Sequence, residues 1–152
     1  RFIICNWLSF LREMQSQMFK RILFIGLGGA GQRHLRLFKE NSPKETELIA
    51  YRSTSKTPVL NHDFTVNNSA SLEELYGVKI FESFDLAISS SPDLAVISTP
   101  SSLHVDYAQL CAEKGINIFI EKKIYLKACV QLQNSHKLPI EILELLTANF
   151  AQ

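Results

Sequence analysis

The chain has 152 residues, a formal net charge of +1 and 20% charged residues. This length suits one domain with a sizeable core, and the balanced charge gives no reason to expect nucleic acid or an acidic membrane surface as a partner. The three cysteines are odd in number and lack C-x-x-C spacing, and the four histidines lie far apart. We therefore expect no disulfide framework, no metal site and a reducing, cytoplasmic location.

The N-terminal stretch is apolar over residues 2–11, which is far shorter than the roughly 20 residues of a membrane span. No small-residue cleavage site follows Arg1, which disfavours a signal peptide. Met18 directly precedes a strong strand pattern. We interpret Met18 as the natural start, residues 1–17 as an extension of uncertain status, and the protein as having no membrane partner.

From Arg21 onward, short continuous apolar runs alternate with amphipathic helical patterns. Such runs are typical of parallel strands that are buried on both faces. The predicted strands are 22–25, 48–51, 78–81, 93–99 and 116–120. Helices are predicted after the glycines at 26–31, after a capping box at 71–74, over 84–88 and over 103–114, with Gly115 as a C-terminal cap and 52–71 as a loop.

This alternation predicts an α/β fold with a doubly wound, Rossmann-type parallel sheet and right-handed crossovers. Ligands on such sheets bind beyond the carboxyl ends of the strands, so the polar residues there are candidate site residues. By contrast, we expect His34 and Cys111, which lie on helix faces, to pack in the core.

The segment from Gly26 to Gly31 matches the pattern G-x-G-x-x-G between a predicted strand and a predicted helix. Gly26 permits the tight turn, Gly28 allows a pyrophosphate to approach the backbone, and Gly31 allows the helix to pack closely on the strand. The N–H groups at the start of the helix would hold the phosphates. A simple structural turn is the alternative, but the strand–turn–helix context favours a dinucleotide.

The second predicted strand ends at Tyr51-Arg52-Ser53 and has no carboxylate there. NAD-binding domains usually place an Asp or Glu at this position for the ribose 2′-hydroxyl, whereas an arginine accommodates a 2′-phosphate. Arg52, with Ser53 as a further donor, therefore favours NADP over NAD. The alternative is that Arg52 is a solvated loop residue and that Tyr51 only packs.

Three ordered motifs, RILFIGLGGAGQRH, DLAVISTPSSLH and GINIFIEK, resemble the nucleotide-binding half of Gfo/Idh/MocA-type oxidoreductases. The resemblance spans about 19–122 and implies a cofactor domain at 18–122 of an enzyme that transfers hydride to or from a sugar, polyol or sugar-derived substrate. It implies the following site residues: Gly26, Gly28, Gly29, Ala30 and Gly31 at the pyrophosphate, Thr99, Pro100 and Ser101 at the nicotinamide, His104 at the cofactor edge, and Glu121 and Lys122 as the start of the family's Glu-Lys-Pro motif. Lys122 would be the catalytic group, because the family's lysine helps position nicotinamide and substrate.

The pattern breaks after Lys122, where Lys123 replaces the expected proline and residues 123–152 form a divergent tail with one helical pattern at 140–150. The family pattern continues with a second α/β domain that supplies the substrate pocket, and we expect that domain to be missing here because residues 123–152 do not match it. We therefore expect a truncated or frame-shifted version of a longer enzyme, which binds its cofactor and acts on a sugar-like substrate only if a second domain is supplied. The alternative is a stand-alone nucleotide-binding or regulatory module, and a homo-oligomer is left open.

Overall fold

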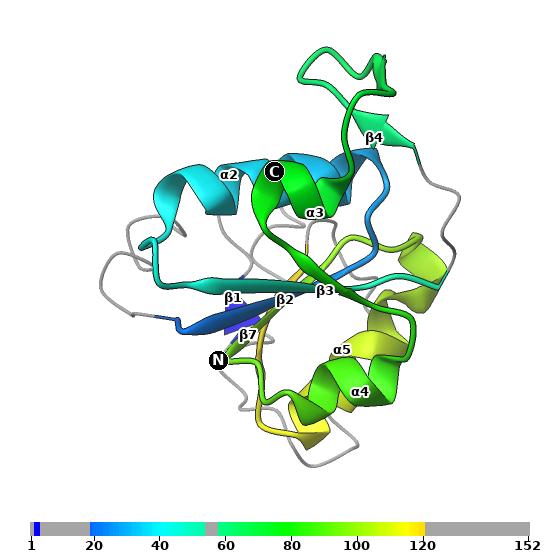
Figure 1. Cartoon of the computed structure of the whole chain (residues 1–152). Coiled ribbons are helices and arrows are strands. Elements are labelled where there is room, and N and C mark those ends of the chain that lie inside the picture. The colour runs from blue at the N-terminus through cyan, green and yellow to red at the C-terminus, as the bar shows by residue number, and fades with distance from the viewer. Residues whose placement is uncertain (1, 4–18, 54–57, 121–152) are drawn as a thin grey trace, which may run out of the picture.

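The computed structural model describes residues 2–3, 19–53 and 58–120. Within these residues, six strands form one parallel sheet in the order β1-β8-β7-β2-β3-β6 (Figure 1). The strands are β1 (Phe2–Ile3), β2 (Arg21–Ile25), β3 (Glu47–Tyr51), β6 (Lys79–Phe81), β7 (Leu94–Ile97) and β8 (Asn117–Ile120). The reversal of strand order on either side of β2 confirms the predicted doubly wound topology.

Helices cover both faces of this sheet (Figure 1). On one face lie α2 (Gly29–Asn41) and α3 (Leu72–Tyr76), and on the other lie α4 (Phe84–Ser89) and α5 (His104–Glu113), which follows the short 3-10 helix η1 (Ser101–Leu103). Successive residues of β2 therefore pack into different cores. Phe24 packs in the cluster that contains Phe38 of α2, whereas Ile25 packs in the cluster that contains Cys111 of α5.

Local signals mark the start of α3 and the end of α5 where the sequence predicts. Ser71 and Glu74 form the expected capping box, with the Ser71 hydroxyl accepting from the Glu74 N–H and the Glu74 carboxylate accepting from the Ser71 N–H. Gly115 takes the left-handed conformation directly after α5, at φ 71°. A left-handed residue at this place is a common way for a helix to end.

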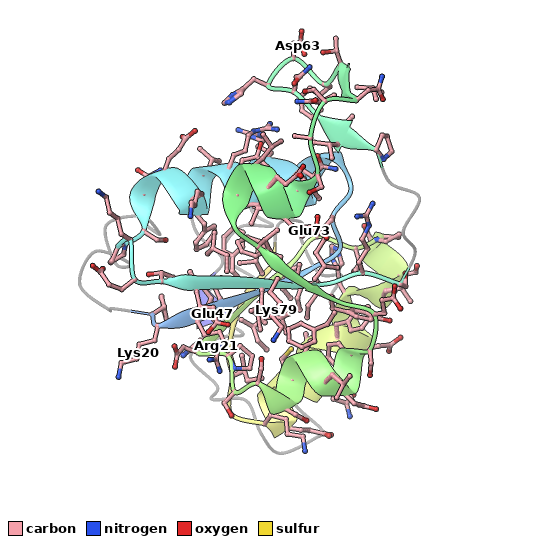
Figure 2. All side chains as sticks on the ribbon, in the orientation of Figure 1. Lys20, Arg21, Glu47, Asp63, Glu73 and Lys79 are labelled. Atoms are coloured by element: carbon pink, nitrogen blue, oxygen red, sulfur yellow. The ribbon has the colours of Figure 1, made fainter. Side chains whose placement is uncertain are left out.

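The predicted loop over 52–71 is wrong at four residues, where β4 (Val59–Leu60) and β5 (Val66–Asn67) form an antiparallel hairpin. These strands are too short for a periodic signal, and side chains of α2 hold them in place: Gln32 contacts Pro58 and Leu60, and Arg36 contacts Leu60. Figure 2 shows Asp63 at the tip of this hairpin, far from the sheet.

Two further parts of the chain bear on the predicted boundaries. Phe2–Ile3, which fall within the predicted N-terminal extension, add the edge strand β1 beside β8. Glu121, Lys122 and the tail at 123–152 lie outside the described residues. The predicted division of the chain at 17 and 122 therefore stays a prediction.

Charged side chains lie at the amino end of the sheet, and a cavity lies at its carboxyl end. At the amino ends of β2 and β3, Arg21 and Glu47 form an ion pair at 2.7 Å, and their side chains lie together in Figure 2. The Asp93 carboxylate accepts hydrogen bonds from the N–H groups of Lys20 and Arg21 at 2.8 Å each, which anchors the start of β2. The candidate site lies at the opposite, carboxyl end of the same strands.

Candidate functional site

A cavity of about 330 Å³ opens at the carboxyl ends of β2, β3 and β7. Its walls come from the glycine loop, the end of β3, the turn after β7, and the start of α5. The lining residues are Gly26, Leu27, Gly28, Tyr51, Arg52, Ser53, Ser98, Thr99, Pro100, Leu103 and Tyr107. This is the place where ligands bind in open α/β sheets.

The glycine loop leaves the floor of this cavity open to a ligand. Gly26 has φ +90°, a conformation that L side chains rarely adopt. A Cβ at Gly31 would lie 2.1 Å from the Gly26 carbonyl oxygen, so only glycine lets α2 pack this closely on β2. Gly28 is exposed, with no atom within 4 Å of the place that a Cβ would take. The strand–turn–helix geometry that the motif requires is therefore present.

The amino end of α2 lacks a side-chain cap. Gly28 is the N-cap residue, and no side-chain hydrogen bond caps the first turn. The first N–H groups of an α-helix have no partner within the helix, and they carry the positive end of its dipole. Because Gly28 lines the cavity, this end of the helix suits an anionic group placed there.

The opposite wall carries positive charge. Arg52 is the only residue with a formal charge among the lining residues of the cavity. Its backbone is fixed, because the Arg52 N–H donates to the Phe81 carbonyl at 3.1 Å while the Gly26 N–H donates to the Tyr51 carbonyl at 3.3 Å. Among the described lining residues, this wall therefore presents one cationic side chain and no carboxylate to the cavity.

Aromatic rings pack around Tyr51, which precedes Arg52 in this wall of the cavity. The Tyr51 ring packs edge-on against the rings of Phe84 and Tyr107, with centroid distances of 5.4 and 6.0 Å. Burial, followed by a hydrogen bond with the Tyr51 side chain, raises the pKa of the Tyr107 hydroxyl. Both tyrosines line the cavity, so Tyr51 packs and also faces the candidate site.

The turn after β7 brings two buried hydroxyls to the cavity without hydrogen-bond partners. Ser98 Oγ and Thr99 Oγ1 are both buried, and neither has a partner among the described residues. A buried polar group without a partner costs about 1–3 kcal/mol, so such groups in a native fold call for an explanation. Here a bound polar ligand or water would satisfy them, and both residues line the cavity.

His104 fixes the turn but does not line the cavity. It is 3% exposed at the first residue of α5, and its Nε2 lies 2.7 Å from the Thr99 carbonyl oxygen. His104 contacts Thr99, which does line the cavity, and its predicted place at the cofactor edge stays a prediction. Ser101 is exposed in η1 and is also outside the lining.

The structure thus brings together seven of the residues predicted for the site: Gly26, Gly28, Tyr51, Arg52, Ser53, Thr99 and Pro100. Gly29, Ala30 and Gly31 form the first turn of α2 behind the loop. Glu121 and Lys122 lie outside the described residues. The sequence analysis missed four lining residues: Leu27, Ser98, Leu103 and Tyr107. Ser98 was detectable as the polar residue between an apolar run and Thr99, whereas nothing local marks Leu103 or Tyr107.

Two packing predictions are confirmed. His34 is 6% exposed, and its ring lies edge-on to Phe119 with a centroid distance of 5.5 Å. Cys111 is fully buried, and burial raises the pKa of its thiol to about 12. In the part of the chain that the structure describes, no three or more His, Cys, Asp or Glu residues come together as a metal site would require. No helix among the same residues has the length and apolar character to cross a bilayer.

Solved structures share this fold. The chain matches apo scyllo-inositol dehydrogenase from Lactobacillus casei with a TM-score of 0.59 and 22% identity, over 80% of this chain and 34% of that one. It matches the WlbA dehydrogenase from Chromobacterium violaceum, solved with NADH and UDP-GlcNAcA, with a TM-score of 0.58 and 16% identity, over 79% of this chain and 32% of that one. The chain thus spans about a third of each of these dehydrogenases.

A curated relative, described as an uncharacterized oxidoreductase of Streptococcus pneumoniae serotype 4, is 27% identical over 103 residues. The alignment covers 67% of this chain and 24% of the relative, so the chain spans about a quarter of that protein. The model of an oxidoreductase family with an NAD-binding Rossmann fold matches residues 20–137, which is most of the chain and extends past Lys122. The chain therefore belongs to the Gfo/Idh/MocA oxidoreductase family, and it carries that family's NAD-binding Rossmann domain.

Proposed function

We propose that this domain binds NADP, or NAD, for an oxidoreductase that transfers hydride to or from a sugar, polyol or sugar-derived substrate. The observation that carries the proposal is the cavity, which has the uncapped amino end of α2 on one side and Arg52 on another. Two anionic groups separated by a ribose, as in NADP, complement this arrangement.

The pyrophosphate would lie over the glycine loop. Its contacts would be with backbone N–H groups of the segment from Gly26 to Gly31, as the G-x-G-x-x-G pattern implies. The open space beside Gly28 supports this placement, because no described residue outside the loop fills it. Arg52 and Ser53 would then contact the 2′-phosphate of the adenosine ribose, and Tyr51 would line the same end.

The nicotinamide, which supplies the hydride or accepts it, would lie toward the turn after β7. Thr99 and Pro100 would line its pocket, with Ser101 beside them. The partnerless hydroxyls of Ser98 and Thr99 support a polar ligand group here, such as an amide or a ribose hydroxyl. His104 would hold the Thr99 carbonyl in place at the cofactor edge.

The substrate would meet the cofactor beyond the described residues. We propose Lys122 as the catalytic group that positions nicotinamide and substrate, with Glu121 beside it, since these residues directly follow the carboxyl end of β8. The sugar, inositol and nucleotide-sugar substrates in the descriptions of the solved structures support the substrate class. Turnover would also require the substrate domain that completes these longer enzymes.

Titration of the purified protein with NADPH and with NADH, followed by nicotinamide fluorescence, tests the proposal. We expect both to bind and NADPH to bind more tightly. Failure to bind either cofactor would refute the proposed function. Binding without oxidation of any sugar or polyol, even with a substrate domain supplied, would favour a stand-alone nucleotide-binding module.

A further inference from the structure

We infer that Gln32 is a positioning residue, which turns the glycine loop so that the Gly28 N–H faces the bound dinucleotide. This inference rests on the proposed function and adds a residue that lies outside the G-x-G-x-x-G motif. Gln32 follows Gly31 in α2, and its side chain is 0% exposed. Gln32 does not line the cavity, so a ligand bound there would not contact its side chain.

The Gln32 side chain bonds only to backbone, in three places. Its Nε2 donates to the Leu27 carbonyl at 3.0 Å and to the Pro58 carbonyl at 2.9 Å, and its Oε1 accepts from the Leu60 N–H at 2.8 Å. Two carbonyls need a donor and one N–H needs an acceptor, so a primary amide matches all three partners. Neither a carboxylate nor an apolar side chain of similar length does so.

The bond to the Leu27 carbonyl sets the direction of the Gly28 N–H. The peptide bonds of the described residues are all trans, and in a trans peptide the C=O and N–H point to opposite sides. Because the Leu27 carbonyl points at the buried Gln32 amide, the Gly28 N–H points away from it, on the side that is open to the cavity. The Gly28 carbonyl accepts from the Gln32 backbone N–H at 2.9 Å, which is the first bond of α2 and would form with any residue except proline at this position. The Gly29 N–H is therefore oriented by the helix and not by the Gln32 side chain.

The Gln32 side chain thus fixes the orientation of one backbone N–H of the loop, that of Gly28, which lines the cavity. An N–H group held in this way at the amino end of a helix is a donor for an anionic group. A site that is already oriented binds more tightly, because the ligand does not have to order the loop. Without the Gln32 amide, the Leu27 carbonyl would lose its partner, and the anion would lose the preformed orientation of the Gly28 N–H.

Arg36 provides a matched control one turn further along α2. It holds the same hairpin, since its Nη1 donates to the Leu60 carbonyl at 3.1 Å, and it is 6% exposed. Its side-chain hydrogen bonds among the described residues go to the Leu60 and Asn61 carbonyls of the hairpin, so Arg36→Met should loosen the hairpin and leave the Leu27 carbonyl in place. A difference between the two variants therefore reports on the loop alone.

The test compares NADPH dissociation constants of the wild-type chain, Gln32→Met, Gln32→Glu and Arg36→Met, with thermal unfolding of each. We expect both Gln32 variants to weaken NADPH binding about tenfold, which corresponds to about one hydrogen bond, and Arg36→Met to change it less than about twofold. NADPH binding unchanged in Gln32→Met, or weakened equally in Arg36→Met, would overturn the inference and leave the proposed function standing. A wild-type chain that binds no cofactor would overturn both.

A second measurement does not depend on the variants folding. In the ¹⁵N–¹H spectrum of the wild-type chain, ADP-ribose should shift the Gly28 and Gly29 amide signals and leave that of Gly115, at the far end of the sheet, in place. ADP-ribose that binds without moving the Gly28 signal would show that this N–H does not face the pyrophosphate, and the inference would be wrong.

Discussion

The glycines of the loop separate into those that serve the ligand and those that serve the packing, and Gly28→Ala against Gly31→Ala tests this division. Gly28 has φ −69° and no atom within 4 Å of the place of a Cβ, so an alanine fits the unliganded protein. Its methyl group would, however, occupy the space through which a pyrophosphate reaches the backbone. Gly31 has no such space, because its Cβ would lie 2.1 Å from the Gly26 carbonyl oxygen.

The magnitudes follow from these distances. For Gly28→Ala we expect a change in the free energy of unfolding within about 1 kcal/mol, since alanine is a poorer N-cap than glycine but also restricts the unfolded chain. Loss of a backbone bond to a phosphate costs about 1.5–3 kcal/mol, so NADPH binding should weaken about ten- to a hundredfold. For Gly31→Ala, the Cβ would lie 2.1 Å from the Gly26 carbonyl oxygen, and Cβ atoms essentially never approach another atom within 3.0 Å. The helix α2 must therefore retreat by about 1 Å, and such overpacking costs about 1–3 kcal/mol of stability.

Urea unfolding and NADPH titration of both variants provide the assay. The expected pattern is a stable Gly28→Ala that binds poorly and a destabilised Gly31→Ala. Wild-type affinity in Gly28→Ala would refute the placement of the pyrophosphate against this residue. Wild-type stability in Gly31→Ala would refute the close approach of α2 to β2.

Three further predictions concern single side chains. Arg52→Ala should weaken NADPH binding by about 1–3 kcal/mol and barely change NADH binding, while the exposed Arg33→Ala changes neither; equal losses for both cofactors would contradict the preference for NADP. The capping box lowers the pKa of Glu74 below its ordinary 4.5, so its contribution to stability is present above that pH and is lost as the pH falls through the lower value of the folded state. Glu74→Ala should therefore be less stable than wild type at pH 7, and urea unfolding should show this difference in stability shrinking as the pH falls below 4.5. A difference that does not depend on pH would argue against the carboxylate. The thiol of Cys111, with its pKa raised to about 12 by burial, should react with a disulfide reagent at pH 8 only after unfolding, and therefore in a slow phase of thiol modification. Cys111→Ser should remove this slow phase from the time course of the reaction.

Much of the fold could be predicted because its signals are local. The run Ile22–Ile25 is apolar at every position, and a parallel strand covered on both faces requires this pattern. The capping box at Ser71 and the glycine at 115 act within one helical turn, so a sequence window of a few residues contains all the partners. The family motifs likewise lie at strand ends, where the alternation of elements places them.

The hairpin and part of the cavity wall had no such local signal. The strands β4 and β5 have two residues each, and they are held by side chains of α2 that lie 24 to 28 positions earlier in the chain. Leu103 and Tyr107 line the cavity because α5 begins beside the end of β3, and sheet order rather than sequence distance sets that neighbourhood. The proposed role of Gln32 likewise has no local signal, because its side-chain partners Leu27, Pro58 and Leu60 lie in two different segments of the chain.

The sequence by itself determined the class of fold, the glycine loop, Arg52 and the turn at Thr99, because each depends on residues next to one another in the chain. Only the tertiary structure showed that the Ser98 and Thr99 hydroxyls are buried without partners among the described residues, that the His104 ring contacts the Thr99 carbonyl, and that the buried Gln32 amide bonds to the Leu27 carbonyl. The physical reason is that burial and hydrogen-bond partners depend on how strands and helices far apart in sequence pack together. A pattern within one element therefore predicts where a ligand contacts the sheet, whereas the packing between elements decides which groups are ready to bind it.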